Sequence, residues 1–231
     1  MLKFVLLACV IGYAAAGQYD QFAEYTNDNP NRNNNRGLRQ DVCDITRPDI
    51  LGPYYKPNAP IRPLAVNGDW ASLCYNVPAH DRLFLNGTIR RLQTGQGCQG
   101  QAVRALMDIW SADFNGVYSN ISPQSPDYGC RLRIYTDNSG YYQFDSIYPG
   151  RYDDGGYRPA HIHFRITPVD ANNRPVGPIF TTQLYFAEDT YLGPNDSCQR
   201  CGSSNPSQIA PLQHNGDYKS FFGTWDVVLA A

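Results

Sequence analysis

The chain has 231 residues, of which 42% are hydrophobic and 17% are charged. This composition can fill a sizeable core, and it excludes disorder throughout, because disordered chains combine few apolar residues with a large net charge. The formal net charge of −2 lacks the basic excess typical of nucleic-acid binding, so we expect no nucleic-acid partner. Seventeen tyrosines, 20 glycines and 17 prolines beside two methionines favour short strands and turns over helices.

The first sixteen residues have the pattern of a secretory signal peptide. Lys3 precedes a run of eight apolar residues over 4–11, and three small residues follow at Ala14–Ala16. This order of basic, apolar and small residues is typical of cleaved export signals. Because so short an apolar run cannot span a bilayer, we expect cleavage after Ala16, a secreted, extracellular chain and no membrane association.

The mature chain is expected to begin with an arm and to continue as one domain. Residues 17–42 are rich in asparagine and almost free of apolar periodicity, which predicts a flexible arm before a folded domain over 43–231. Apolar and polar residues alternate over 83–89, as in a half-buried strand. Residues 103–110 form a second run of strand length.

Two further runs, 131–136 and 141–144, flank Asp137-Asn-Ser-Gly140. This turn sequence predicts a β-hairpin in which Gly140 can adopt a positive φ. Further strands are expected over 160–167, 180–186 and 224–229. Short strands at this spacing, without a convincing helical stretch, predict an all-β fold with a single β-sandwich.

Cysteines and sequons agree with export. Of the seven cysteines, Cys9 leaves with the signal peptide, and the six that remain are Cys43, Cys74, Cys98, Cys130, Cys198 and Cys201. An even number in an exported chain favours three disulfides, whose pairing the sequence leaves open. A zinc or redox role for the Cys198-Gln-Arg-Cys201 pair is the less favoured alternative. Three sequons, at Asn86, Asn120 and Asn195, are possible glycosylation sites.

A His-x-His pair in the stretch 158–166, RPAHIHFRI, carries the clearest chemical signal. In a strand, His161 and His163 project from one face while Ile162 and Phe164 project into the core. Two imidazoles about 7 Å apart on one face can converge on one metal ion. The alternative interpretation is a solvated strand face. The other histidines, His80 and His214, are expected to be ordinary surface residues.

Tyrosines are the available partners for these histidines, because no carboxylate follows at metal-ligand spacing. The nearby ones are Tyr118, Tyr148, Tyr152 and Tyr157. A phenol is a poor ligand while it is protonated, but a highly charged cation such as Fe(III) favours the phenolate. Two phenolates and two imidazoles would leave a trivalent ion with a net charge of roughly +1 and an open position for an anionic substrate.

Several short segments then identify a family. They are Gly52-Pro-Tyr-Tyr55, Ala105-Leu-Met-Asp-Ile-Trp110, Gly116-Val-Tyr-Ser119, Gly140-Tyr-Tyr-Gln-Phe144, Pro149-Gly-Arg-Tyr152, Arg158-Pro-Ala-His-Ile-His-Phe164 and Thr182-Gln-Leu-Tyr-Phe186. In these segments and their order the chain resembles the intradiol ring-cleavage dioxygenases, the family of catechol and protocatechuate dioxygenases. The segment 158–164 together with two upstream tyrosines is the specific part of the match.

The resemblance implies a non-haem Fe(III) cofactor and assigns its ligands. These are Tyr118, Tyr152, His161 and His163. Tyr152 occupies the Pro-x-x-Tyr position of the family, but its interval to His161 is short for the family, so Tyr148 stays open as the second tyrosinate.

The resemblance also implies roles in catalysis and substrate binding. The equivalent of Tyr152 leaves the iron when a catechol binds and takes up a catechol proton as a base. Arg158 matches the active-site arginine, which contacts substrate and stabilises charge that develops on the ring. Gln183 matches a position beside that arginine, and Tyr54 is expected in the pocket wall. Oxygen from O2 is inserted between the hydroxyl-bearing carbons to give a cis,cis-muconate.

The segment before Cys43 is too short for the helical region through which catechol dioxygenases dimerise, so we expect a monomer with a more open site. Its expected partners are a catechol-type substrate and O2. The alternatives are a non-catalytic secreted β-sandwich that binds zinc or copper through His161 and His163, and a structural or carbohydrate-associated module. The joint presence of the four ligands and Arg158 favours the enzyme.

Overall fold

The computed structural model describes residues 44–66, 69–74, 81–93, 99–153, 155–215 and 220–231. The expected signal peptide (1–16) and asparagine-rich arm (17–42) therefore lie outside the described residues, as does Cys43. Contacts within the chain divide it into two units, Met1–Gln40 with Asn67–Asp69, and Asp41–Val66 with Trp70–Ala231. The second unit contains almost every described residue, and its fold is described below.

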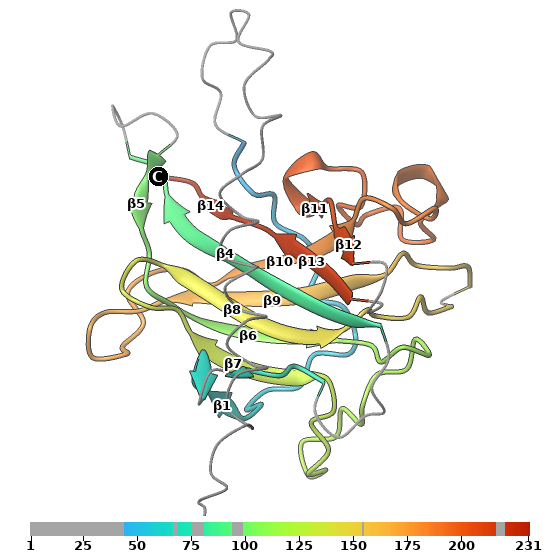
Figure 1. Ribbon diagram of the computed structural model, residues 1–231, viewed down its shortest axis with the longest axis horizontal. Helices are drawn as coiled ribbons and strands as arrows, with labels where there is room; N and C mark the ends of the chain where they lie inside the picture. Colours follow the sequence, from blue (N-terminus) through green and yellow to red (C-terminus); the bar gives the residue numbers. More distant parts are fainter. Residues whose placement is uncertain (1–43, 67–68, 75–80, 94–98, 154, 216–219) are drawn as a thin grey trace, which may run out of the picture. The chain divides into compact units, whose positions relative to one another are not determined.

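The first sheet of this unit has six strands, in the order β1, β7, β6, β9, β10 and β11 (Figure 1). Their bounds are β1 Ile61–Arg62, β7 Arg131–Tyr135, β6 Ala105–Ser111, β9 His161–Pro168, β10 Phe180–Phe186 and β11 Ile209–Ala210. The four inner strands pair antiparallel, whereas the short edge strands β1 and β11 run parallel to their neighbours.

The second sheet is built around one long strand, β4. Its members are β12 (Gln213–Asn215), β13 (Ser220–Thr224), β4 (Arg82–Arg91), β14 (Val227–Leu229), β5 (Gln101–Ala102) and β8 (Tyr141–Ile147). Two further strands, β2 (Ala65–Val66) and β3 (Asp69–Trp70), form a separate two-stranded sheet. Helical structure in the described residues is limited to short 3-10 turns, such as η3 (Gly193–Asn195) and η4 (Pro206–Gln208).

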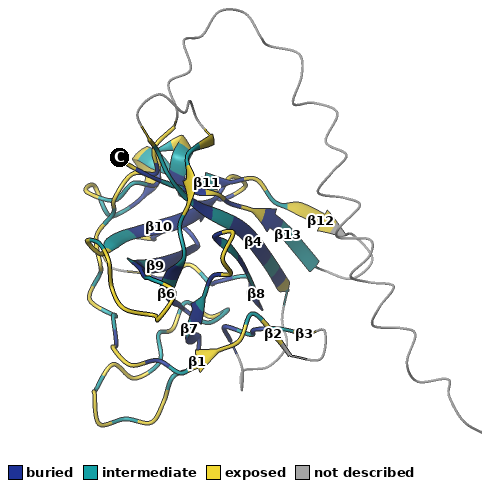
Figure 2. Ribbon diagram, turned by 90° about the vertical axis from the view of Figure 1, so that its left-hand side faces the viewer, coloured by how far each residue is buried: buried dark blue, intermediate teal, exposed yellow. Residues whose placement is uncertain are grey.

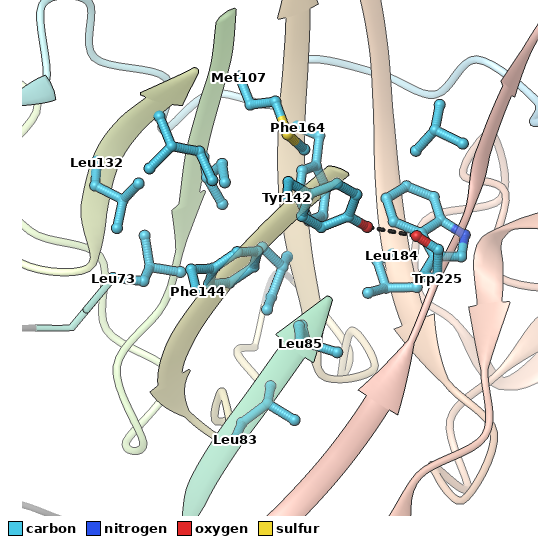
Figure 3. Packing of buried hydrophobic residues seen from close by; sticks show 14 of the residues in the cluster. Leu73, Leu83, Leu85, Met107, Leu132, Tyr142, Phe144, Phe164, Leu184 and Trp225 are labelled. Atoms are coloured by element: carbon cyan, nitrogen blue, oxygen red, sulfur yellow. Dashed lines mark hydrogen bonds between the residues drawn. The ribbon is translucent and has the colours of Figure 1, made fainter. Parts of the chain in front are cut away.

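The apolar side chains of the two sheets pack against each other, as expected for a β-sandwich (Figure 3). Leu83 and Leu85 come from β4 and Phe144 from β8, whereas Ile162 and Phe164 come from β9, and all five are at most 1% exposed. Full burial of each such side chain stabilises the fold by about 1.5–3 kcal/mol. The predicted all-β sandwich is confirmed, as is the inward orientation of the apolar residues of β9.

The expected hairpin over 131–136 and 141–144 is wrong. The turn itself forms, with Gly140 at a φ of 78° and the backbone N–H of Asp137 donating to the carbonyl of Tyr141. Its two strands then diverge, because β7 pairs with β1 and β6 while β8 pairs with β4 of the other sheet. A local turn signal cannot distinguish these outcomes, since both strands bury alternate side chains in the same core.

Four other expected strands form, β10 at the expected residues and the rest with ends shifted by one or two residues. Strands β4, β6, β9 and β10 correspond to the runs at 83–89, 103–110, 160–167 and 180–186. The single strand expected over 224–229 is instead divided between β13 and β14, where the Trp225 N–H donates to the carbonyl of Asn86.

Part of the outer face of the first sheet is buried as well (Figure 2). There the outward side chains of Trp110 on β6, His163 on β9 and Gln183 on β10 belong to residues that are at most 1% exposed. Connecting segments contact this face, among them the loop that contains Gly52 and Tyr55. This covered outer face holds the residues that carry chemistry.

Candidate functional site

Three adjacent strands bring the floor of the site together. His163 of β9 pairs in register with Trp110 of β6 on one side and with Gln183 of β10 on the other. Two residues earlier, His161 pairs with Tyr185. Because paired residues project from the same side of a sheet, these five side chains share the outer face.

Both histidines are buried and held in place. The Nδ1 atom of His161 lies 2.6 Å from the carbonyl oxygen of Pro159 and donates to it, which leaves the Nε2 lone pair available for a ligand. The ring of His163 stacks on Trp110, with centroids 4.8 Å apart and planes at 4°. Its Nδ1 atom has no partner among the described residues. A solvated strand face is therefore excluded.

Electrostatics keep both imidazoles neutral. Burial, followed by the charge of Arg158, lowers the pKa of His161 to about 3. Burial and His161 together hold the pKa of His163 well below its usual value. Neutral imidazole is the form that binds a metal, so the pair is ready to ligate at neutral pH.

Tyr118 places its hydroxyl between the two histidines. The phenol oxygen lies 3.4 Å from Nε2 of His161 and 3.2 Å from Nε2 of His163. Gly116, at a φ of 80°, lets the chain approach so closely that a Cβ would lie 2.2 Å from the carbonyl oxygen of Arg151. Burial raises the pKa of Tyr118, and a negative charge at Tyr152 would raise it further. The phenol therefore keeps its proton unless a cation binds.

Tyr152, and not Tyr148, lies beside the histidines. The ring of Tyr152 is centred 5.5 Å from that of Tyr118 and 5.6 Å from that of His161. Tyr148 packs instead on apolar rings of the core, 5.0 Å from Phe186 and 5.1 Å from Phe221. The fourth nearby tyrosine, Tyr157, is 49% exposed. The structure therefore brings together Tyr118, Tyr152, His161 and His163.

Arg158 joins this cluster from the side. Its Nη1 donates to the hydroxyl of Tyr152 at 3.3 Å, and its Nη2 donates to Oε1 of Gln183 at 3.3 Å. Its Nε forms an ion pair with Asp196 at 3.0 Å, and its Nη2 also donates to the hydroxyl of Tyr185 at 3.1 Å. The guanidinium group is 2% exposed, so it is fixed from several directions.

Sequence reasoning missed two of these partners. Asp196 stands inside the sequon that begins at Asn195, where it drew attention only as part of a glycosylation signal. Tyr185 follows Gln183 by two residues and thus shares its face of β10. The strand period could have found Tyr185, whereas Asp196, 38 residues from Arg158, gave no local signal.

A cavity of about 470 Å³ opens onto the tyrosines. It is lined by Tyr54, Asn115, Gly116, Val117, Tyr118, Arg151, Tyr152, Asp153 and Tyr157. Tyr54 stacks on Tyr118 with ring centroids 4.4 Å apart, which agrees with its expected place in the pocket wall. Tyr118 and Tyr152 of the cluster are thus accessible from this cavity.

Two disulfides answer part of the pairing question. Cys74 bonds to Cys130 and Cys198 bonds to Cys201, while Cys43 and Cys98 lie outside the described residues.

In the part of the chain that the structure describes, no three His, Cys, Asp or Glu side chains gather as a metal site. His214 is exposed as expected, and His80 lies outside the described residues. Among the described residues, no helix is long and apolar enough to cross a bilayer.

Comparisons with known proteins add to this geometry. Residues 50–231 match the family model described as Dioxygenase. A chlorocatechol 1,2-dioxygenase of Rhodococcus opacus is 31% identical over 197 residues, which are 78% of this chain and 68% of that protein. The intradiol ring-cleavage dioxygenase prcA of Aspergillus niger is 27% identical over 174 residues. The match covers 68% of this chain and 50% of the Aspergillus protein.

Solved structures agree with the fold. The dioxygenase domain of a dioxygenase carbohydrate-binding protein fusion from Streptomyces sp. SirexAA-E superposes with a TM-score of 0.59 at 26% identity. That alignment covers 81% of this chain and 99% of the other. The 3-chlorocatechol 1,2-dioxygenase of R. opacus 1CP has a TM-score of 0.63 at 24% identity and aligns over 82% of this chain and 74% of its own.

Proposed function

Because this chain belongs to the family of intradiol ring-cleavage dioxygenases, we propose that it cleaves catechol-type aromatics between the two hydroxyl-bearing carbons. O2 is the co-substrate, and a cis,cis-muconate is the product. One observation carries the proposal: the hydroxyl of Tyr118 lies against Nε2 of both His161 and His163, and Tyr118 also lines an open cavity.

The donor set fits non-haem Fe(III). Two neutral imidazoles and two phenols converge, and Nδ1 of His161 is already engaged by the carbonyl of Pro159. The high pKa of Tyr118 means that only a strongly charged cation would hold it as a phenolate. We therefore assign Tyr118, Tyr152, His161 and His163 as ligands. When bound, Fe(III) supplies a Lewis acid that draws electron density from a catecholate.

Tyr152 accepts a proton, and Arg158 stabilises negative charge. The phenolate oxygen of Tyr152 accepts a proton from a catechol hydroxyl as the substrate enters, so this tyrosine acts as a base. Nη1 of Arg158 points at that same oxygen and at 3.3 Å lowers the cost of its negative charge. The same guanidinium stabilises charge that develops on the substrate ring, and Gln183 holds it in position.

The cavity supports a broad range of catechols, because it is much larger than a single catechol ring and opens to solvent. Tyr54 forms one wall, where its own ring stacks on that of Tyr118. We also propose that the protein acts as a monomer and outside the cell. The export pattern in residues 1–16 and the two disulfides support the second point.

Any glycans are expected at Asn120 and Asn195, which are exposed. The third sequon is a poor acceptor, because Asn86 is 6% exposed within β4 and its side chain accepts a hydrogen bond from Thr224.

Visible spectroscopy of the iron-loaded protein tests the ligand set. Tyrosinate bound to Fe(III) absorbs broadly in the visible range, and the band should shift when a catechol is added without O2. We expect the band to weaken or move in Tyr118→Phe and Tyr152→Phe. Tyr148→Phe is the matched control and should leave the band unchanged, because Tyr148 packs on Phe186 and Phe221 and not beside the histidines. A protein that takes up no iron would contradict the cofactor assignment.

Product analysis tests the reaction class separately. Oxygen uptake with catechol should yield a cis,cis-muconate that contains both atoms of O2. Ring opening beside the hydroxyl-bearing carbons, rather than between them, would overturn the proposed regiochemistry even if the ligand set is correct. Uptake should fall at least about a hundredfold in Arg158→Gln, the range for loss of one charge-stabilising donor.

A further inference from the structure

A second cavity, of about 140 Å³, lies on the outer face of the first sheet and shares no lining residue with the cavity above Tyr118. Its floor comes from β7, β6 and β9, which are neighbours in the sheet (Figure 1). Its lining residues are Tyr55, Pro57, Asn58, Leu106, Asp108, Arg133, Arg165 and Thr167. The catalytic proposal gives this cavity no role.

The charged residues of this cavity form one row. Asp108 of β6 pairs in register with Arg133 of β7 and with Arg165 of β9, so all three side chains share one face. Among the described residues, no ion pair joins Asp108 to either arginine. Tyr55 bridges two of them instead: its hydroxyl donates to Oδ2 of Asp108 at 3.0 Å and accepts from Nη1 of Arg165 at 2.9 Å.

Positive charge therefore exceeds negative charge around the cavity. Two arginines face one carboxylate, and Arg131 of β7 also lies near enough to act on Asp108. Burial nevertheless raises the pKa of Asp108 to about 6, against the hydrogen bond from Tyr55 and the arginine charges. The carboxylate thus loses its charge within the range in which proteins are commonly studied, and the positive excess then grows.

We propose that this cavity binds a small carboxylate anion between the guanidinium groups of Arg133 and Arg165. Guanidinium groups match the two oxygens of a carboxylate. A singly charged anion balances the excess of one positive charge left by the row, whereas a phosphate dianion would be repelled by ionised Asp108. Protonated Asp108 removes repulsion and offers an O–H donor, so the anion binds more tightly in acid.

Binding can be followed through a neighbouring fluorophore. The ring of Tyr55 packs on Trp110 with centroids 5.0 Å apart, and Trp110 in turn stacks on His163. An anion that engages Arg165 acts on the hydroxyl of Tyr55, which Arg165 contacts. Occupancy is therefore expected to change the emission of Trp110.

The experiment titrates the purified chain with formate at constant ionic strength, at pH 5 and pH 7, by tryptophan emission and calorimetry. Formate stays ionised over this range. We expect saturable binding that is up to about tenfold tighter at pH 5, as titration of one group near pH 6 requires. Arg133→Gln and Arg165→Gln should each weaken it about tenfold. Arg174→Gln, an exposed arginine, is the control and should have no effect.

Asp108→Asn gives a test by gain of affinity. This variant should bind formate at pH 7 about as tightly as the unmodified chain does at pH 5, with little remaining pH dependence. This measurement does not depend on whether the arginine variants fold. The proposal is overturned if formate does not saturate at either pH, if chloride binds equally well, or if phosphate binds more tightly than formate at pH 7.

Discussion

At the scale of single residues, Lys56 is a buried cation surrounded by carbonyl groups. The residue is 1% exposed, and its ammonium donates to the backbone oxygens of Asn120, Ser125 and Asp127 at 3.0, 2.8 and 2.6 Å. It also lies 4.1 Å from the ring centre of Tyr128. Lys56 thus ties the segment that carries Tyr54 to the loop that follows Tyr118.

Lys56→Met keeps the apolar stem and removes the donors. Leaving three partly buried carbonyl groups without this donor should lower the free energy of unfolding by about 1–3 kcal/mol. Urea unfolding measures this loss. The exposed Arg174→Met should change stability by less than about 0.5 kcal/mol. A Lys56→Met variant as stable as the original chain would mean that water or neighbouring groups satisfy these carbonyls.

Gly52 makes room for His163. At a φ of 74°, a Cβ on Gly52 would lie 3.1 Å from Cε1 of the His163 ring. We expect Gly52→Ala to cost about 1–2 kcal/mol in backbone strain and, in addition, to lower iron uptake by displacing the imidazole. Gly155→Ala is a matched control, because Gly155 has a similar φ of 71° and nothing within 4 Å of its Cβ position. Equal iron content in both variants would refute the displacement.

At the scale of elements, the loop after β10 positions Arg158 through Asp196. Both side chains are at most 3% exposed. Asp196→Asn keeps the shape but leaves a buried guanidinium charge without its counter-ion, which should cost about 3–5 kcal/mol. Thermal unfolding tests this. Asp170→Asn should be nearly neutral, because Asp170 accepts backbone N–H groups in an exposed turn, as asparagine also can. Similar stability of the two variants would argue against the ion pair.

The sequence patterns predicted which residues form strands better than they predicted which strands pair with each other. The period of two on β9 correctly separated His161 and His163 from the apolar core residues. The same local logic joined β7 to β8, because a turn motif carries no information about which sheet each strand enters. Tyr118 and Tyr152 were two of several nearby tyrosines, and only the family resemblance singled them out. Lys56 was missed, since its carbonyl partners stand 64 to 71 residues away in the chain.

At the scale of the whole folded unit, the two disulfides among the described residues close loops of very different length. Cys74 and Cys130 are separated by 56 residues, and Cys198 and Cys201 by three. Since loop-closure entropy grows with length, removing the first should cost about 4 kcal/mol and removing the second about 2 kcal/mol. Urea unfolding of Cys74→Ala/Cys130→Ala and Cys198→Ala/Cys201→Ala compares them. The reverse order would show that native-state contacts outweigh chain entropy.

Strand β9 alternates between packing and chemistry, with Ile162 and Phe164 on one side and His161 and His163 on the other. A slip of one residue would exchange the two sets. It would bury imidazoles among apolar groups and turn Ile162 and Phe164 toward Tyr118. A chain with β9 in the wrong register would therefore lose the packing of its core together with its activity. In any preparation, the fraction of molecules able to bind a catechol should equal the fraction that has folded correctly.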